Sequence, residues 1–226
     1  MEIIESEDNA MKRFCYSGQY HSPQIISFIK GKKDHVEALL RTGRIYTATV
    51  FAFDNQNIFV YYECVDEELS PLEILPGAEA YLNKWPGTDE TRWFIPMIDI
   101  YHSMQPNKEE EVHWHRTEHA VPKASMSLMR LDTLSSYIFY HVQLQEEKPS
   151  CNGKHMSIWS SEDIALLYSE KPDEKLENPH KGMLDTKNTP TDWGGVMIPH
   201  FIRREDGELY HMADIVLTMS EGDLSD

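Results

Sequence analysis

The feature that most constrains the fold of this chain is an internal repeat with a spacing of about one hundred residues. The segment 57–62, NIFVYY, resembles the segment 163–168, DIALLY. Further along the chain, the segment 92–98, RWFIPMI, resembles the segment 192–198, DWGGVMI. Both matches occur in the same order, a strand-like segment with a tyrosine and then Trp-x3-Met-Ile, which indicates a duplication and predicts two similar units.

Length and composition agree with two globular units. The chain has 226 residues, which permits one large domain or two domains of about 110 residues each. Hydrophobic residues make up 40% of the chain and charged residues 26%, so a packed core is expected. The net charge of -17 disfavours nucleic acid and anionic membrane surfaces as partners. We therefore expect a soluble cytoplasmic protein with a small-molecule ligand, as a monomeric pseudo-dimer or a homodimer.

Cysteine usage and the absence of targeting signals lead to the same expectation. The three cysteines, Cys15, Cys64 and Cys151, form no CxxC pair, and an odd number fits poorly with a disulfide framework. Residues 1–8 are acidic and do not form a signal peptide. No stretch approaches the roughly 18 apolar residues that a membrane helix needs.

Apolar periodicity and turn residues give a similar order of elements in the two halves. In the first half we predict, in order, a strand at 13–20, a helix at 32–41, strands at 44–53 and 58–65, a helix at 70–84 and a short helix that carries Trp93 and Met97. After a charged linker at 106–111 we predict strands at 112–116 and 124–131, a helix at 132–147, strands at 155–160 and 164–170, the Trp193 segment and a strand at 210–219.

This order is that of the ferredoxin-like split βαβ unit. The fold class is therefore predicted to be α+β, with repeat 1 at residues 12–105 and repeat 2 at residues 112–220. Helices would cover one face of each antiparallel sheet, and the other apolar face needs a partner. We expect the two sheets to pack face to face as an intrachain α+β barrel, a pseudo-dimer within one chain.

Tyr137 and His141 are the candidate catalytic residues. They are four residues apart on the helix predicted at 132–147, on the side of Leu134 and Leu144, so both should point inward. A histidine can act as general acid or base near neutral pH, and a tyrosine one turn away can orient it or donate a proton. The alternative is a core histidine with its hydrogen bonds satisfied beside a core aromatic residue.

Trp93 and Trp193 occupy matching places in the two repeats and are candidate substrate-binding residues. Flat aromatic faces suit sugar rings, although both could instead anchor a helix to its sheet. Arg92 and Asp99 flank Trp93 and could bind hydroxyl groups, or could form a solvated ion pair.

The sequence favours no metal and no cofactor. Histidines gather near Trp114, at His102, His113, His115 and His119, and the alternation of His113 and His115 would permit metal binding on one side of a strand. HEXXH and paired cysteine ligands are absent, however, so we predict no metal site. The chain also lacks GxGxxG, P-loop and GxSxG motifs.

Two motifs resemble the L-rhamnose mutarotase family. The first is the hairpin segment 57–63, NIFVYYE, followed by Arg92-Trp93-Phe94-x2-Met97-x-Asp99, where the family has a strand ending in Glu and then Arg-Trp-Trp-x2-Met-x-Asp. The second is Tyr137-x3-His141, which is similar to a Tyr-x3-His in the family's first helix. The resemblance implies a ferredoxin-like dimeric α+β barrel that interconverts sugar anomers without cofactor or metal, with the histidine acting on the anomeric hydroxyl.

The chain departs from this family in ways that leave three functions open. The family is a single repeat of about half this length, and neither repeat of this chain carries both motifs. The first hypothesis is a sugar-binding protein or mutarotase-like isomerase that uses His141 and Tyr137. The second is a non-enzymatic ligand-binding or interaction protein that keeps the barrel. The third is a barrel that processes haem or a small aromatic molecule, like a monooxygenase.

Overall fold

The computed structural model describes residues 11–65, 67–86, 91–103, 114–116, 118–149, 152–174 and 181–224. These residues form two compact units. Unit 1 takes the described residues up to Pro96, those between 105 and 120, and those from Ile215 onward. Unit 2 takes the described residues of 97–104 and 121–214. Each unit combines an antiparallel sheet with helices, so the predicted α+β class is confirmed. Closure of the two sheets into one barrel stays a prediction.

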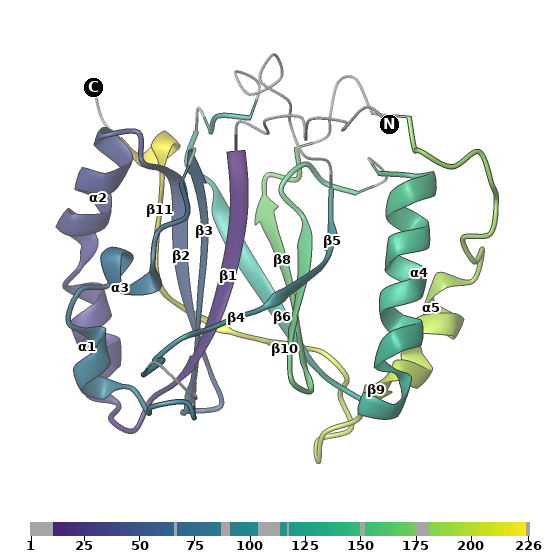
Figure 1. The fold of residues 1–226 in the computed structure, drawn as a ribbon, viewed down its shortest axis with the longest axis horizontal. Helices are drawn as coiled ribbons and strands as arrows, with labels where there is room; N and C mark the ends of the chain where they lie inside the picture. Colours follow the sequence, from purple (N-terminus) through teal and green to yellow (C-terminus); the bar gives the residue numbers. More distant parts are fainter. Residues whose placement is uncertain are drawn as a thin grey trace, which may run out of the picture. The chain divides into compact units, whose positions relative to one another are not determined.

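Unit 1 is built on a five-stranded sheet. Its strands, in their order across the sheet, are β11 (Asp214–Ser220), β2 (Ile45–Phe53), β3 (Asn57–Val65), β1 (Met11–Gln19) and β4 (Ile95–Pro96). The helices of this unit lie along one face of the sheet (Figure 1), and they are α1 (Gln24–Lys30), α2 (Lys33–Arg41) and α3 (Pro71–Ile74). Short 3-10 helices follow at Ala78–Tyr81 and Glu221–Asp223.

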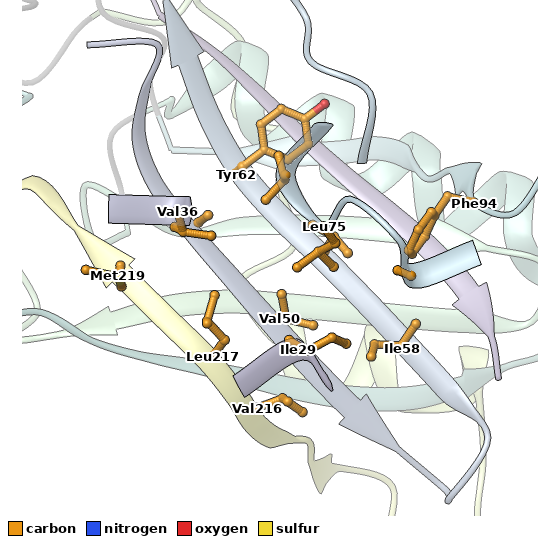
Figure 2. Close-up of a cluster of buried hydrophobic side chains, with 14 of the residues drawn as sticks. Ile29, Val36, Val50, Ile58, Tyr62, Leu75, Phe94, Val216, Leu217 and Met219 are labelled. Carbon is orange, nitrogen blue, oxygen red and sulfur yellow. The ribbon is translucent and has the colours of Figure 1, made fainter. Parts of the chain in front are cut away.

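The core of unit 1 fills the space between these helices and the sheet. Apolar side chains at Val36 and Leu40 are four residues apart on α2 and face the sheet. Alternate residues of β3, including Ile58 and Tyr62, point back toward the helices, as Figure 2 shows. Val216 of β11 belongs to the same cluster, so the end of the chain completes a core that the first repeat begins.

Unit 2 is built on a six-stranded sheet with the same arrangement. The strands run in the order β10 (His211–Met212), β6 (Val121–Met129), β8 (Ile164–Lys171), β7 (Ser157–Ser161) and β5 (Ile98–His102), and β9 (Phe201–Ile202) also pairs with β6. Helices α4 (Leu134–Glu147) and α5 (Trp193–Met197) lie along one face of this sheet (Figure 1). Two 3-10 helices, at Leu131–Thr133 and Ile198–His200, flank them in sequence.

The two repeats exchange one strand each. β4 pairs with β1 in unit 1, but β5, which follows β4 after a single residue, pairs with β7 in unit 2. In return, β11 at the end of repeat 2 lies beside β2 in unit 1, where the Thr47 hydroxyl donates to the Met219 carbonyl over 3.1 Å. The predicted repeats at 12–105 and 112–220 stay a prediction, and the compact units differ from these ranges by the exchanged strands. Neighbours in sequence do not determine which sheet edge a strand joins.

The structure also corrects the alignment of the two repeats by one residue. The hairpin turn has three residues in unit 1, between Phe53 and Asn57, but two in unit 2. A slip of one residue moves every side chain to the other face of a strand. Tyr168 therefore matches Tyr61 and not Tyr62. Each of these tyrosines donates to a glutamate two residues on, over 2.7 Å to Glu63 and 2.6 Å to Glu170.

Two predicted helices differ from the structure, and one observed helix was not predicted. The predicted capping box at Ser70 is present, but the helix predicted at 70–84 ends early because the chain turns at Gly77, whose φ of 92° suits glycine. The segment after Trp93 is strand β4, so the helix predicted there is wrong. α1 covers a run that carried no helix prediction. The linker predicted at 106–111 lies outside the described residues. Within the described part of the chain, no helix has the length and apolar character needed to cross a membrane.

A buried ionic cluster lies on the face of the unit 1 sheet opposite the helices. The Arg116 guanidinium donates two hydrogen bonds to the Glu63 carboxylate, over 2.8 and 3.0 Å. Arg13 lies 4.0 Å from the same carboxylate and 4.7 Å from the centre of the Trp114 ring. The side chains of Glu63, Arg116 and Arg13 are at most 2% exposed. The opposed charges offset the cost of burying each of them.

The strand exchange predicts an effect that crosses the sequence boundary between the repeats. Replacing Leu217 of β11 with alanine removes buried methyl groups from the unit 1 core and is expected to cost about 2–5 kcal/mol of stability. Hydrogen exchange would then quicken at amides of β2 and β3 in unit 1. Faster hydrogen exchange at amides of β6 and β8, with exchange in β2 and β3 unchanged, would contradict the exchanged arrangement.

Candidate functional site: a cavity beside helix α4

A cavity of about 390 Å³ lies within unit 2, and helices α4 and α5 and strands of its sheet contribute to the lining. This volume is in the range of small-molecule sites. Most of its lining is apolar or aromatic, with Tyr101, Tyr137, Ile158, Trp193, Met197 and Phe201 among the residues. Polar side chains from Lys148, Asn152 and Thr189 also contribute to the lining.

Helix α4 places Tyr137 and His141 in this cavity. They are the buried residues of the helix and are 4% and 3% exposed. Their spacing of four residues brings them to the same side of the helix, and their ring centres are 4.2 Å apart. The helix continues for six residues beyond His141 and ends before Lys148. The prediction that both side chains point inward is confirmed by their burial.

The hydrogen bond of His141 determines which of its nitrogens can act on a ligand. Its Nδ1 lies 2.8 Å from the backbone carbonyl oxygen of Tyr137, which can only accept. Nδ1 therefore carries the hydrogen, and the neutral ring presents its lone pair at Nε2. Burial lowers the pKa of His141 to about 4, against a smaller opposing effect of the Tyr137 carbonyl. At neutral pH the site thus offers an uncharged acceptor.

Aromatic rings hold the His141 ring in place. The Trp193 ring meets it edge to face, with centres 5.0 Å apart and planes at 85°. Tyr101 of β5 lies on another side, at 6.3 Å and 64°. The phenol of Tyr101 accepts a hydrogen bond from the Asn152 amide over 2.9 Å. Such edge-to-face pairs restrict the orientation of the imidazole.

Tyr137 remains protonated in this setting. Burial raises its pKa above the ordinary value for a phenol, and the neighbouring Tyr210 adds to the effect. A neutral phenol can donate one hydrogen bond but cannot serve as an anionic base near pH 7. His141 is therefore the better proton acceptor of the pair.

A short helix supplies Trp193. The Asp192 side chain accepts a hydrogen bond from the Gly195 backbone N–H over 2.9 Å. Asp192 thus caps the N-terminus of α5, just before Trp193. Met197 lies four residues after Trp193, and both line the cavity. The sequence match that singled out Trp193 thus identified a residue of the cavity wall.

The other predicted binding residues lie elsewhere. Trp93 and Arg92 belong to unit 1, where they line a more open groove with Tyr16 and Glu68, and Arg92 is exposed. The Lys84 ammonium lies 5.2 Å from the centre of the Trp93 ring. These residues are not part of the His141 cavity, because the chain passes into unit 2 only after Pro96.

Asp99 does belong to unit 2, but it faces a histidine instead of the cavity. Its carboxylate is 2.7 Å from Nδ1 of His102, and both side chains are partly exposed. The Gln145 amide lies 3.0 Å from Nε2 of the same ring. That Arg92 and Asp99 bind hydroxyl groups of a ligand stays a prediction, and the two residues belong to different units.

The clustered histidines are divided between the units. His102 pairs with Asp99 in unit 2, whereas His115 lies 3.0 Å from Glu221 and His119 pairs with Asp223 in unit 1. His113 lies outside the described residues. Among the residues that the structure describes, no group of three or more His, Cys, Asp or Glu side chains is arranged to hold a metal ion.

Several cavity residues had no signal in the sequence analysis. Tyr101 lies in β5, whose place in unit 2 depends on the strand exchange. Phe201 and Tyr210 follow α5, and their rings meet at 68°. Their aromatic character, shortly after the Trp193 segment, is the one sequence feature that could have indicated them.

The chain was compared with family models, curated proteins and solved structures. No family model matches it, and no curated protein matches it. Among solved structures, a protein of Lactobacillus acidophilus NCFM named "putative monooxygenase" is similar over 94% of this chain and 97% of its own, with 4% identity and a TM-score of 0.44. A protein of the same name from Fusobacterium nucleatum subsp. nucleatum ATCC 25586 covers 95% and 96%, with 7% identity and a TM-score of 0.45.

A third structure, named an anthrone oxidase-like protein, covers 96% of this chain and 95% of its own, with 9% identity and a TM-score of 0.36. Likeness at these identities and scores carries no conclusion about activity. None of these matches is to the L-rhamnose mutarotase family, so that resemblance stays a prediction.

Proposed function

We propose that the cavity of unit 2 binds a small, largely apolar aromatic molecule that carries a hydroxyl group, and that His141 accepts the hydrogen of that hydroxyl. The observation that carries the proposal is the buried, neutral imidazole with its lone pair at Nε2, inside a cavity lined mainly by aromatic and aliphatic side chains. The apolar lining and the weak basicity of His141 together indicate the kind of ligand.

The lining favours an aromatic ligand over a sugar. Trp193, Phe201 and Met197 offer apolar contact, which suits an aromatic ring that carries few hydroxyl groups. A sugar would bury many hydroxyl groups, and each one without a partner costs free energy. The polar side chains of Lys148, Asn152 and Thr189 can serve a limited number of polar groups on the ligand.

His141 suits hydrogen bonding better than general proton abstraction. Because its pKa is about 4, it is a weak base and takes a proton fully only from an acidic group. A phenolic hydroxyl matches it, since this donor is stronger than an aliphatic alcohol. The ligand-binding hypothesis and the aromatic-processing hypothesis both agree with this site.

The test compares 1-naphthol with naphthalene, which has the same rings without the hydroxyl. Wild-type protein should bind 1-naphthol about tenfold more tightly than naphthalene, the effect of one hydrogen bond in a buried site. In the His141→Phe variant an aromatic ring is kept and the acceptor is lost, so this preference should disappear while naphthalene still binds. Fluorescence titration measures both affinities.

Further arms separate binding from catalysis. Oxygen uptake with 1-naphthol that vanishes in His141→Phe would indicate an oxygenase, and binding without uptake would indicate a binding protein. Haemin, followed by its Soret band, tests the haem alternative. L-Rhamnose, followed by NMR exchange between its anomers, tests the mutarotase alternative. Naphthol binding that is equal in wild type and His141→Phe would overturn the proposed role of His141.

A further inference from the structure

The segment 181–190, which we term the strap, lies against the C-terminal end of α4. It has no regular secondary structure, and most of its residues are exposed. At its end, Thr189 and Pro190 form part of the cavity lining, and Trp193 follows three residues later. The position of the strap therefore determines part of the wall around the proposed ligand.

The Glu147 carboxylate holds the strap through several hydrogen bonds. Its Oε1 accepts from the backbone N–H of Asn188 over 2.7 Å, and its Oε2 accepts from the backbone N–H of Thr189 over 2.9 Å. The hydroxyls of Thr186 and Thr189 also donate to this carboxylate. Gln143, one turn earlier on α4, donates to Oε1 over 2.7 Å. Both oxygens are thus engaged, and hydrogen bonds to a charged acceptor are the stronger kind.

The backbone of the strap also lies close to the end of the helix. The Leu184 amide donates to the Glu146 carbonyl over 3.0 Å. At Gly182, an added Cβ would lie 2.3 Å from the Glu146 carbonyl oxygen, closer than a real Cβ can approach. A glycine is therefore required where the strap first meets the helix.

The geometry points to Glu147 as a positioning residue for the cavity, which keeps the strap closed over it and so slows ligand release. This inference rests on the proposed function, because it assigns a task to the wall of that site. Glu147 lies six residues after His141 on the same helix, so one rigid element carries both the acceptor and the residue that holds the wall.

The ionisation of Glu147 agrees with this assignment. Burial pulls the pKa of its carboxyl upward, but the hydrogen bonds from Thr186, Thr189 and Asn188 outweigh this effect and hold the pKa at about 2. The carboxylate therefore remains charged throughout the neutral and mildly acidic range, and the strap is held over that whole range.

The experiment uses the variants Glu147→Ala and Glu147→Gln, with Glu146→Gln as the matched control. Glu146 meets the strap through its backbone carbonyl, which the control leaves in place. Trypsin can cut after the exposed Lys187 within the strap. We expect Glu147→Ala to speed this cut and the dissociation of 1-naphthol each by about tenfold, as loss of charged hydrogen bonds implies. Glu147→Gln should be intermediate, since an amide keeps one acceptor.

A second variant tests the same inference by another route. Gly182→Ala leaves Glu147 intact but pushes the strap away from the helix, and it should give the same two effects. Far-UV circular dichroism shows whether each variant is folded. Cleavage and dissociation rates that match the wild type in both Glu147→Ala and Gly182→Ala would overturn the inference.

The two proposals fail in different ways. If wild-type protein does not bind 1-naphthol or naphthalene, the proposed function is wrong and the role in ligand retention is wrong with it. If the ligand binds, and its dissociation is unchanged in Glu147→Ala although the strap is cut faster, then the strap is held by Glu147 but does not retain the ligand. In that case the proposed function stands and the inference fails.

Discussion

Replacing Glu63 with alanine is expected to lower the free energy of unfolding by about 3–5 kcal/mol, the cost of breaking a buried ion pair from one side. The variant leaves Arg116 inside unit 1 without the carboxylate that receives its two hydrogen bonds. It also removes the acceptor of the Tyr61 hydroxyl. Urea denaturation at pH 7, followed by circular dichroism, measures the change.

Two comparisons make this result specific to the buried charge. Glu37→Ala breaks an exposed pair with Arg41 and should cost less than about 1 kcal/mol. Glu63→Gln keeps the size and a hydrogen-bond acceptor but removes the charge, so it should cost nearly as much as Glu63→Ala. A cost for Glu63→Gln as small as that for Glu37→Ala would show that the charge of Glu63 contributes little to stability.

The sequence predicted the local elements of the fold better than their pairing. Apolar spacing was enough to predict α4 and the hairpin of β7 and β8, because these depend on neighbours in sequence. The exchange of β5 and β11 could not be predicted in the same way. The apolar pattern of a strand is the same whichever sheet edge the strand joins. The edge that it joins depends on contacts between residues distant in sequence.

The candidate site shows the same limit. The spacing of Tyr137 and His141 placed both on the buried side of one helix, and the repeat match identified Trp193. Trp93, from the same match, lines the separate groove of unit 1, where it precedes strand β4, whereas Trp193 begins helix α5. Matching tryptophans in the two repeats thus line two different hollows, one in each unit.

The position of Glu147 on its helix is unusual for an acidic residue. An acidic residue in the last turn of a helix opposes the helix dipole, which favours lysine or arginine there. Glu146 and Glu147 both occupy that turn in α4. An unfavourable charge at such a place indicates a compensating partner, but the partners, Thr186 and Thr189, lie about forty residues away and could not be identified from spacing.

The burial of His141 is expected to make the stability of unit 2 depend on pH. The folded chain binds a proton at His141 only near pH 4, whereas an unfolded histidine does so near its ordinary pKa of 6.5. Between these values the unfolded chain binds more protons, so acid favours unfolding. The stability that comes from keeping His141 neutral is fully present above pH 6.5 and is lost as the pH falls to about 4. The loss amounts to about 3 kcal/mol.

The His141→Phe variant isolates this contribution, because phenylalanine does not titrate and all other groups are common to both proteins. Urea denaturation of both proteins at several values between pH 7 and pH 4 should show the wild type losing about 3 kcal/mol more than the variant. Parallel curves would mean that His141 titrates alike in the folded and unfolded chains. The imidazole would then be open to water, and the dry acceptor on which the proposed ligand site depends would not exist.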